Sequence, residues 1–243
     1  MSAAPRLQLD LGNSRLKWRL VAGGRVLSRG ACAPGDAAWL ASPEAPQAVQ
    51  VASVAEAATE AALAARVREQ LGLEPYFVRT AARFGDLVNS YPEPERMGVD
   101  RWLAMIAARA QCADRLCVVD AGSALTIDLV AADGRHEGGY IVPGSALMAR
   151  ALLADTGRVR FEAGQADSLA PGRSTAACVH HGIALAQAGA LQLALREAAG
   201  SGPPPRVIAS GGGGARLLEL AALADAAYRE DLVFEGLALA APL

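Results

Sequence analysis

The chain has 243 residues, of which 52% are hydrophobic and 20% charged, and its formal net charge is −2. This composition supports a folded protein with a large core and excludes a disordered chain. The near-neutral charge, without a basic block, argues against nucleic-acid binding. No apolar run reaches the roughly 20 residues that span a bilayer, and the start, MSAAPRLQLD, lacks the apolar core of a secretory signal. The four cysteines form no C-x-x-C pair. We therefore expect a cytoplasmic protein without nucleic-acid or membrane partners.

The first predicted elements are three strands, over Arg6–Leu11, Arg15–Ala22 and Arg25–Arg29. An Asp-Leu-Gly turn joins the first strand to the second, and a Gly-Gly hairpin turn joins the second to the third. An alanine-rich helix over Glu56–Leu71 follows, then a short buried strand over Pro75–Val78. The next predicted helix covers residues 100–110 and opens with an aspartate, a residue type that favours the first position of a helix.

The opening pattern returns 110 residues later. LQLDLGNS lies over CVVDAGSA, which pairs Asp10 with Asp120 and Gly12 with Gly122, and VAGGR falls on AADGR without a gap. The second set of elements comprises strands over Leu116–Ala121, Leu125–Ala131 and Gly134–Val142, a long helix over Ser174–Ala199 and a strand over Val207–Ala209. Strands and helices that alternate in two similar halves predict an α/β protein of two related lobes, residues 1–110 and 111–243, with the active site in the cleft between them.

The two Asp-x-Gly turns suggest a site for phosphates. A glycine after a buried strand lets backbone N–H groups approach a phosphate, while the carboxylate can hold a hydrated cation. Lys17 strengthens this reading, because it is the only lysine in the chain and follows the first turn closely. The alternatives are that Asp and Gly simply favour turns, and that Lys17 lies on a solvated strand face.

A further candidate is GVDR, Gly98 to Arg101, at the start of a predicted helix. Helix N-termini favour anions, and Arg101 adds a positive charge that can bind a carboxylate or phosphate. Asp100 can accept a proton from a substrate hydroxyl, as kinases require. The alternative is that Asp100 only caps the helix and Arg101 is solvated.

With DLGNSRLK, GVDR, DAGSALT and GGYIVPG in this order, the sequence resembles type III pantothenate kinase, of the acetate and sugar kinase/Hsp70/actin superfamily. The resemblance covers almost the whole chain. It implies two ribonuclease-H-like lobes and a kinase that uses ATP to phosphorylate pantothenate to 4'-phosphopantothenate, the first step of coenzyme A biosynthesis.

The resemblance also implies roles for individual residues. Asp100 would be the catalytic base. ATP would be bound by Asp10, Leu11, Gly12, Asn13, Ser14, Arg15, Leu16, Lys17 and Ser123. Pantothenate would be bound by Tyr91, Gly98, Val99, Asp100, Arg101 and Thr175. Asp10 would lie near the Mg²⁺ of Mg-ATP, and Asp120 would bind the monovalent cation, K⁺ or NH₄⁺, that the family requires.

Two positions depart from the family pattern: Ser123 replaces the usual threonine but keeps a hydroxyl, and Ser174 replaces an asparagine. The resemblance further implies a homodimer in which the neighbouring subunit completes the substrate site. Two alternatives stay open. One is another small-molecule kinase of the superfamily, and the other is a non-catalytic regulatory or transcription accessory protein with the same fold.

Overall fold

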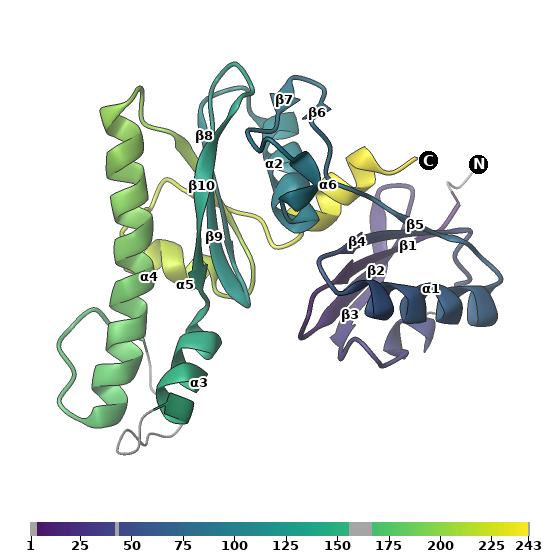
Figure 1. Cartoon of the computed structure of the whole chain (residues 1–243), viewed down its shortest axis with the longest axis horizontal. Helices are drawn as coiled ribbons and strands as arrows, with labels where there is room; N and C mark the ends of the chain where they lie inside the picture. The colour runs from purple at the N-terminus through teal and green to yellow at the C-terminus, as the bar shows by residue number, and fades with distance from the viewer. Residues whose placement is uncertain (1–3, 42–43, 156–166, 243) are drawn as a thin grey trace. The chain divides into compact units, whose positions relative to one another are not determined.

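A computed structural model describes residues 4–41, 44–155 and 167–242. The chain divides into two compact units, each built on a five-stranded sheet (Figure 1). The first unit comprises residues 1–85, 91–107 and 232–243, and the second comprises residues 86–90 and 108–231.

The sheet of the first unit has the order β3-β2-β1-β4-β5. Its central strand β1 is antiparallel to β2 and parallel to β4, and β2 is antiparallel to β3. The strands are β1 (Arg6–Leu11), β2 (Leu16–Ala22), β3 (Arg25–Cys32), β4 (Ala48–Ser53) and β5 (Pro75–Phe77). The three N-terminal strands were predicted from the sequence to within three residues at each end, whereas β4 was not predicted.

The sheet of the second unit has the equivalent order, β10-β9-β8-β11-β12. Again the central strand β8 is antiparallel to the following strand β9 and parallel to a later one, β11. The strands are β8 (Leu116–Ala121), β9 (Ala124–Val130), β10 (His136–Pro143), β11 (Arg206–Ser210) and β12 (Ala227–Tyr228). Two sheets with the same strand order and directions confirm the predicted α/β fold with an internal duplication.

The strand registers correct one detail of the predicted repeat. In the first sheet Asp10 lies opposite Lys17, and in the second Asp120 lies opposite Thr126. Lys17 therefore corresponds to Thr126, and not to Ile127 as the ungapped alignment requires. The reason is that the turn after Asp120 is one residue shorter and the hairpin that follows is longer. The alignment without a gap is thus wrong over the second strand of the repeat.

The core of the first unit forms where α1 (Ala57–Leu71) covers its sheet. Leu63 and Val67 of α1 are buried against leucines and valines of the central strands. Central strands are covered on both faces, so their residues are buried almost without alternation. The helix ends at Gly72, whose φ of 66° gives the left-handed cap that glycine adopts without strain.

The C-terminal helix α6 (Leu232–Ala240) returns to the first unit and contacts β1 and β4. Gln50 of β4 donates a hydrogen bond of 3.0 Å to the carbonyl oxygen of Pro242. In space, the C-terminal residues thus pack with the N-terminal sheet. The predicted boundary between two folding domains, placed between residues 110 and 111, stays a prediction.

The core of the second unit lies between its sheet and the long helix α4 (Thr175–Gly200). Ala188, Leu191 and Ala194 of α4 are buried against β8, β9 and α5. Ser174 caps this helix, because its side-chain oxygen accepts a hydrogen bond from the Ala177 amide at 3.1 Å. The predicted start of the helix at Ser174 is therefore confirmed.

The remaining elements are short, apart from α2 and α3. They are η1 (Ala38–Ala41), β6 (Arg83–Phe84), β7 (Leu87–Val88), η2 (Pro94–Arg96), α2 (Val99–Gln111), α3 (Ser145–Asp155) and α5 (Gly214–Leu220). The predicted helix at Asp100 thus begins one residue earlier. Within the residues described, no helix is both long and apolar enough to cross a membrane.

Candidate active site

The first predicted phosphate loop is a tight turn between β1 and β2. The amide of Gly12 donates a hydrogen bond of 3.0 Å to the carbonyl oxygen of Arg15. Asn13, Ser14 and Arg15 are exposed. The side chains of Leu11 and Leu16 are fully buried in the core, so these two residues can offer a ligand only their backbone groups.

Asp10 and Lys17 lie opposite one another at the base of this turn. The Lys17 Nζ is 3.9 Å from the Asp10 Oδ2, with the lysine side chain 45% exposed and the aspartate 17% exposed. Both charges are therefore accessible at the same end of the sheet. A carboxylate and an ammonium side by side can serve a hydrated cation and a phosphate respectively.

Gly98 determines where the Asp100 carboxylate can lie. A Cβ atom at position 98 would be 2.6 Å from Asp100 Oδ1, closer than two such atoms approach. The same Oδ1 accepts a hydrogen bond of 2.8 Å from the Arg101 amide. The carboxylate thus folds back over the start of α2, into space that exists because residue 98 is glycine.

Val54, just after β4, connects this carboxylate to the first turn. Its amide donates a hydrogen bond of 3.1 Å to the Leu11 carbonyl oxygen, and its Cγ1 is 3.6 Å from the Cβ position of residue 98. The first unit therefore brings Gly98 and Asp100 to the end of the sheet that carries Asp10 and Lys17. The sequence prediction missed β4 and with it this contact, because the polar Gln50 interrupts its apolar run.

Arg101 and Tyr91, which were both predicted to bind substrate, contact one another. The guanidinium donates a hydrogen bond of 3.0 Å to the Tyr91 hydroxyl and lies 5.8 Å from the centre of its ring. Arg101 is only 5% exposed, so it is not the solvated side chain of the alternative reading. Val99, beside them, is buried and contributes no polar side chain.

The second Asp-x-Gly turn lies in the second unit and is packed against two glycine segments. Gly211, in the run SGGGG, has a φ of +81° and lies against the end of β8. A Cβ atom there would collide with the Asp120 carboxylate and would lie 2.5 Å from the Ala121 carbonyl oxygen. Two oxygens thus face the same small space, and such oxygen ligands suit a hard cation.

Gly144 supports the same turn from the other side. Its amide donates a hydrogen bond of 3.1 Å to the Ser123 carbonyl oxygen, and a Cβ atom would lie 2.5 Å from the carbonyl oxygens of Gly122 and Ser123. Ser123 is exposed at the tip of the turn. In the sequence these contacts come from the last glycine of GGYIVPG and the first glycine of SGGGG.

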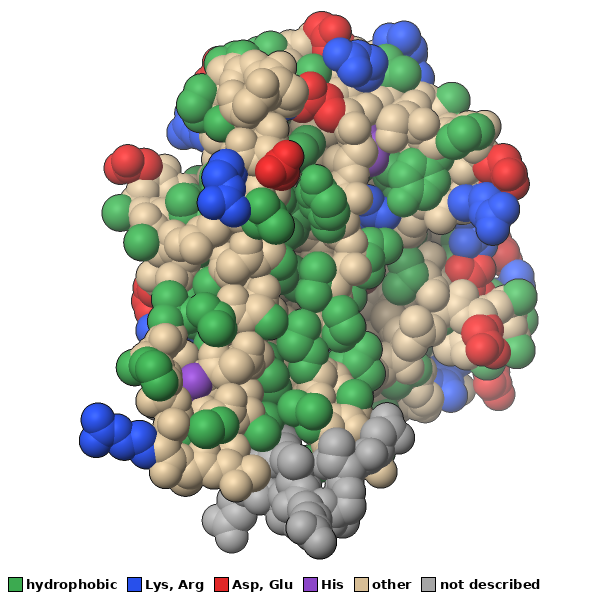
Figure 2. Space-filling view, turned by 60° about the vertical axis from the view of Figure 1, so that its left-hand side comes forward, with side chains coloured by type: hydrophobic (Ala, Val, Ile, Leu, Met, Phe, Trp, Pro, Cys, Tyr) green, Lys and Arg blue, Asp and Glu red, His purple; other side chains and the backbone are tan. Residues whose placement is uncertain are grey.

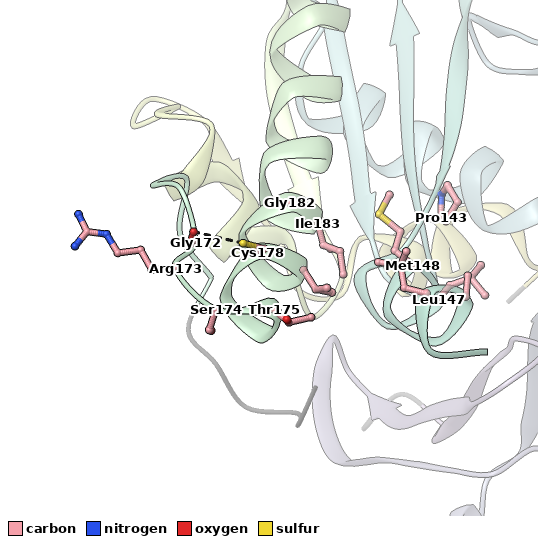
Figure 3. Close-up of a pocket in the computed structure, with 13 residues that line it drawn as sticks. Pro143, Leu147, Met148, Gly172, Arg173, Ser174, Thr175, Cys178, Gly182 and Ile183 are labelled. Atoms are coloured by element: carbon pink, nitrogen blue, oxygen red, sulfur yellow. Dashed lines mark hydrogen bonds between the residues drawn. The ribbon is translucent and has the colours of Figure 1, made fainter. Parts of the chain in front are cut away.

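Thr175 lies at an apolar cavity of about 1040 Å³ between α3 and α4 (Figure 3). Its lining includes Pro143, Leu147 and Met148 on one side and Thr175 and Ile183 on the other. Pro143 precedes Gly144 directly in the chain, so the cavity begins beside the second turn. Thr175 is exposed in the first turn of α4 and provides a hydroxyl at the cavity.

The predicted site residues therefore form two groups, one in each unit. Within the first unit, the loop from Asp10 to Lys17 shares one region with Gly98 and Asp100 through Val54. Within the second unit, Asp120 and Ser123 lie at the second turn and Thr175 at the adjacent cavity. In the part of the chain that the structure describes, no cluster of three or more His, Cys, Asp or Glu side chains is placed to hold a metal ion.

Known sequences place these motifs in a single family. A sequence profile described as type III pantothenate kinase matches residues 6–197. A protein of that name from Hahella chejuensis is 40% identical over 179 residues, which cover 73% of this chain and 74% of that protein. Another, from Pseudomonas aeruginosa, is 36% identical over 246 residues, which cover 98% and 99% of the two chains.

Solved structures agree on the fold. A Campylobacter jejuni protein described as a Baf family transcriptional activator matches with a TM-score of 0.62 and 23% identity, over 96% of each chain. A Sinorhizobium meliloti protein described as a 2-dehydro-3-deoxygalactonokinase matches with a TM-score of 0.61 and 17% identity, over 97% of each chain. At these identities the likeness concerns the fold alone. The profile and the curated relatives, which cover most of the sequence, show that the chain belongs to the type III pantothenate kinase family.

Proposed function

We propose that the chain transfers the γ-phosphoryl group of ATP to the primary hydroxyl of pantothenate, in the cytoplasm, where its four free thiols stay reduced. Its family membership supports the reaction. The observation that carries the assignment to a site is the Asp100 carboxylate, held at the sheet end that also carries Asp10 and Lys17. Phosphoryl transfer depends on positioning and on charge neutralisation, and these residue types suit both tasks.

Asp100 is the general base in this proposal. It accepts the proton of the pantothenate hydroxyl as that oxygen attacks the γ-phosphorus. Gly98 and the Arg101 amide, which constrain its carboxylate, support an orientation that is set before the substrate binds.

The phosphates of ATP would be bound by the turn of residues 10–17 and by Ser123. Asn13, Ser14 and Arg15 of the first turn are exposed, so their backbone amides and the Ser14 hydroxyl can donate hydrogen bonds, and Lys17 adds a positive charge. Leu11 and Leu16 would take part through their backbone alone. Asp10 would hold the Mg²⁺ that arrives with ATP, and that ion neutralises charge on the phosphates.

Asp120 would bind the monovalent cation, K⁺ or NH₄⁺. The convergence of its carboxylate and the Ala121 carbonyl oxygen beside Gly211 supports this assignment, because such cations prefer oxygen ligands. A bound cation there would offset part of the negative charge of the nucleotide.

Pantothenate would be bound by Tyr91, Gly98, Val99, Asp100, Arg101 and Thr175. Pantothenate carries one carboxylate, and Arg101 is a buried guanidinium that donates a hydrogen bond to the Tyr91 hydroxyl. A guanidinium held in this way is a suitable partner for a carboxylate. Thr175 would add a hydroxyl from the second unit.

A homodimer is part of the proposal. Exposed leucines lie on α3 (Leu147, Leu152 and Leu153) and on α4 (Leu185 and Leu193), and two of them, Leu147 and Leu152, line the apolar cavity. Figure 2, which turns α4 toward the viewer, displays hydrophobic side chains gathered on this face. Apolar surface of this kind is typical of subunit interfaces, and Thr175 lines the same cavity as Leu147 and Leu152. Sedimentation velocity at micromolar concentration tests this point, with a dimer as the expected species.

The reaction is tested by a coupled ADP-release assay with purified protein, Mg-ATP and pantothenate, run in K⁺ and in Na⁺. ADP release that requires pantothenate and K⁺ is the expected result. Full activity in Na⁺ would remove the cation role of Asp120. A protein that releases no ADP in either salt, with relatives active in parallel, would favour the regulatory alternative.

A further inference from the structure

Three side chains in the second unit form a hydrogen-bonded path, and its last member, Ser90, directly precedes Tyr91 in the sequence. His136 Nε2 is 3.0 Å from Asp128 Oδ1, and His136 Nδ1 is 2.8 Å from Ser90 Oγ. The side chains of His136 and Asp128 are 0% and 2% exposed, whereas Ser90 is exposed. A buried polar pair thus extends to the surface through one serine hydroxyl, and the next residue in the chain is Tyr91.

Along this hydrogen-bonded path, each donor is matched by an acceptor. A carboxylate oxygen accepts hydrogen bonds, so His136 Nε2 is the donor in the bond to Asp128 Oδ1. With Nε2 as the donor, the other ring nitrogen, Nδ1, can accept a hydrogen bond from the Ser90 hydroxyl. Because each bond determines the orientation of the next group, the buried carboxylate fixes the ring and the ring fixes the serine.

Residues 86–90 are fastened to the second unit at two further points. The Arg109 guanidinium donates hydrogen bonds of 2.9 and 2.7 Å to Asp86 Oδ2, and the Val88 amide donates one of 2.9 Å to the Gly134 carbonyl oxygen. Gly134 has a φ of +86° and lies against the backbone of Asp86. The bond from Ser90 to His136 is the last of these attachments before Tyr91.

Tyr91 itself belongs to the first unit, where its hydroxyl accepts the hydrogen bond from Arg101. Tyr91, which contacts Arg101, therefore directly follows Ser90, a residue anchored on the second unit. Because Ser90 and Tyr91 share a peptide bond, a shift of Ser90 would displace the backbone of Tyr91, whose hydroxyl contacts Arg101.

We propose that Asp128, His136 and Ser90 are positioning residues for pantothenate: they hold the chain at Ser90 so that Tyr91 and Arg101 present a preformed substrate site. This inference rests on the proposed function, because it assigns the residues that set substrate affinity at that same site. None of the three touches the reacting atoms, so their effect falls on pantothenate binding and not on phosphoryl transfer.

The proposal is tested by substitution of Ser90, the exposed end of the hydrogen-bonded path. Ser90→Ala removes one hydroxyl and leaves the buried pair in place. We expect the KM for pantothenate to rise about fivefold, the size of one lost neutral hydrogen bond. The kcat and the KM for ATP stay within about twofold, because neither depends on Tyr91. Ser90→Thr keeps a hydroxyl and restores the KM for pantothenate.

Ser201→Ala is the matched control. Ser201 also exchanges hydrogen bonds within the second unit, with Arg115 and Ala198, but lies at the far end of α4. It should leave both KM values unchanged. In a His136→Gln background, Ser90→Ala should add no further effect, since the two changes interrupt the same path.

Hydrogen–deuterium exchange gives a readout that does not depend on activity. The peptide that covers residues 86–97 should exchange faster in Ser90→Ala than in the wild type or in Ser201→Ala. An unchanged KM for pantothenate with unchanged exchange, or an equal rise in both KM values, would overturn the positioning role. If the wild type does not phosphorylate pantothenate, the proposed function fails, and the exchange of residues 86–97 still decides whether Ser90 anchors this segment.

Discussion

Lys17 lies directly opposite Asp10 across the β1–β2 pair, with its Nζ 3.9 Å from the aspartate Oδ2. In the second unit the equivalent neighbour of Asp120 is Thr126, which carries no charge. The duplicated turns therefore differ at this position: the first has a carboxylate and an ammonium, and the second has a carboxylate and a hydroxyl. This difference agrees with the proposal that Lys17 of the first turn contributes to phosphate binding, whereas Asp120 of the second turn binds the monovalent cation.

Replacing Lys17 should weaken ATP binding with little effect on folding. We expect Lys17→Met to raise the KM for ATP about tenfold, the loss of one charge-assisted contact to phosphate. The free energy of unfolding should change by less than about 1 kcal/mol, because the lysine is 45% exposed and its ion pair is solvated. Steady-state kinetics and urea unfolding measure the two effects. Arg25→Met, which removes an exposed cation from β3, is the control, and an equal KM change there would argue against a specific role for Lys17.

Gly98→Ala should move the Asp100 carboxylate, because the new Cβ would lie 2.6 Å from its Oδ1. We expect kcat to fall by about tenfold or more, since a base displaced by about 1 Å loses much of its efficiency. The matched change in the same unit is Gly35→Ala, where no atom lies within 4 Å of the new Cβ. A normal kcat in Gly98→Ala would mean that the carboxylate position does not limit the reaction.

Alanine substitutions at Gly211 and Gly212 distinguish the effect of crowding Asp120 from the effect of adding a methyl group alone. At Gly211 a Cβ meets the Asp120 carboxylate and the backbone must keep a φ of +81°, whereas at Gly212 no atom lies within 4 Å. We expect Gly211→Ala to lower stability by roughly 1–3 kcal/mol and to raise the K⁺ concentration needed for half activity. Gly212→Ala should leave both near the wild-type values. Identical K⁺ dependence in the two variants would contradict cation binding at Asp120.

Burial raises the pKa of the Cys117 thiol to about 12, from an ordinary value of 9.0. Above pH 9 the unfolded chain loses this proton while the folded chain retains it, so the unfolded state binds fewer protons and stability falls as pH rises. The contribution is complete below pH 9 and is lost between pH 9 and about 12. Urea unfolding between pH 8 and 10.5 should show a slope up to about 1.4 kcal/mol per pH unit steeper in the wild type than in Cys117→Ala. Equal pH slopes in the wild type and in Cys117→Ala would contradict the raised pKa of Cys117 in the folded state.

The sequence was sufficient to predict the elements on which the repeat depends. Strand β1 was predicted with its exact bounds, because an apolar stretch ends there in an Asp-x-Gly turn. The long helix α4 was predicted because Ser174 marks its start and apolar residues recur along it. Both turns could likewise be located, since the Asp and Gly residues of each are only two positions apart in the chain.

What could not be predicted depends on contacts between distant segments. Gly98 and Val54 are 44 positions apart, and no local pattern indicates that they meet. Gln8 and Gln50 are residue types expected at the surface, yet their side chains hydrogen-bond to one another in the core at 2.8 Å. Because this partner of Gln50 could not be foreseen, strand β4 was not predicted. Ser90 and His136 likewise meet only after folding, so the path that ends at Tyr91 left no trace in the sequence.

The most direct measurement of the central claim is the kcat of Asp100→Asn in the ADP-release assay, with pantothenate, Mg-ATP and K⁺. Asparagine keeps the shape of the side chain but cannot accept the proton of the substrate hydroxyl. We predict a fall in kcat of about 10²- to 10⁴-fold with an unchanged melting temperature and an unchanged affinity for ATP. A variant that retains more than about a tenth of the wild-type kcat, a loss in barrier below about 1.4 kcal/mol, would contradict the assignment of Asp100 as the base.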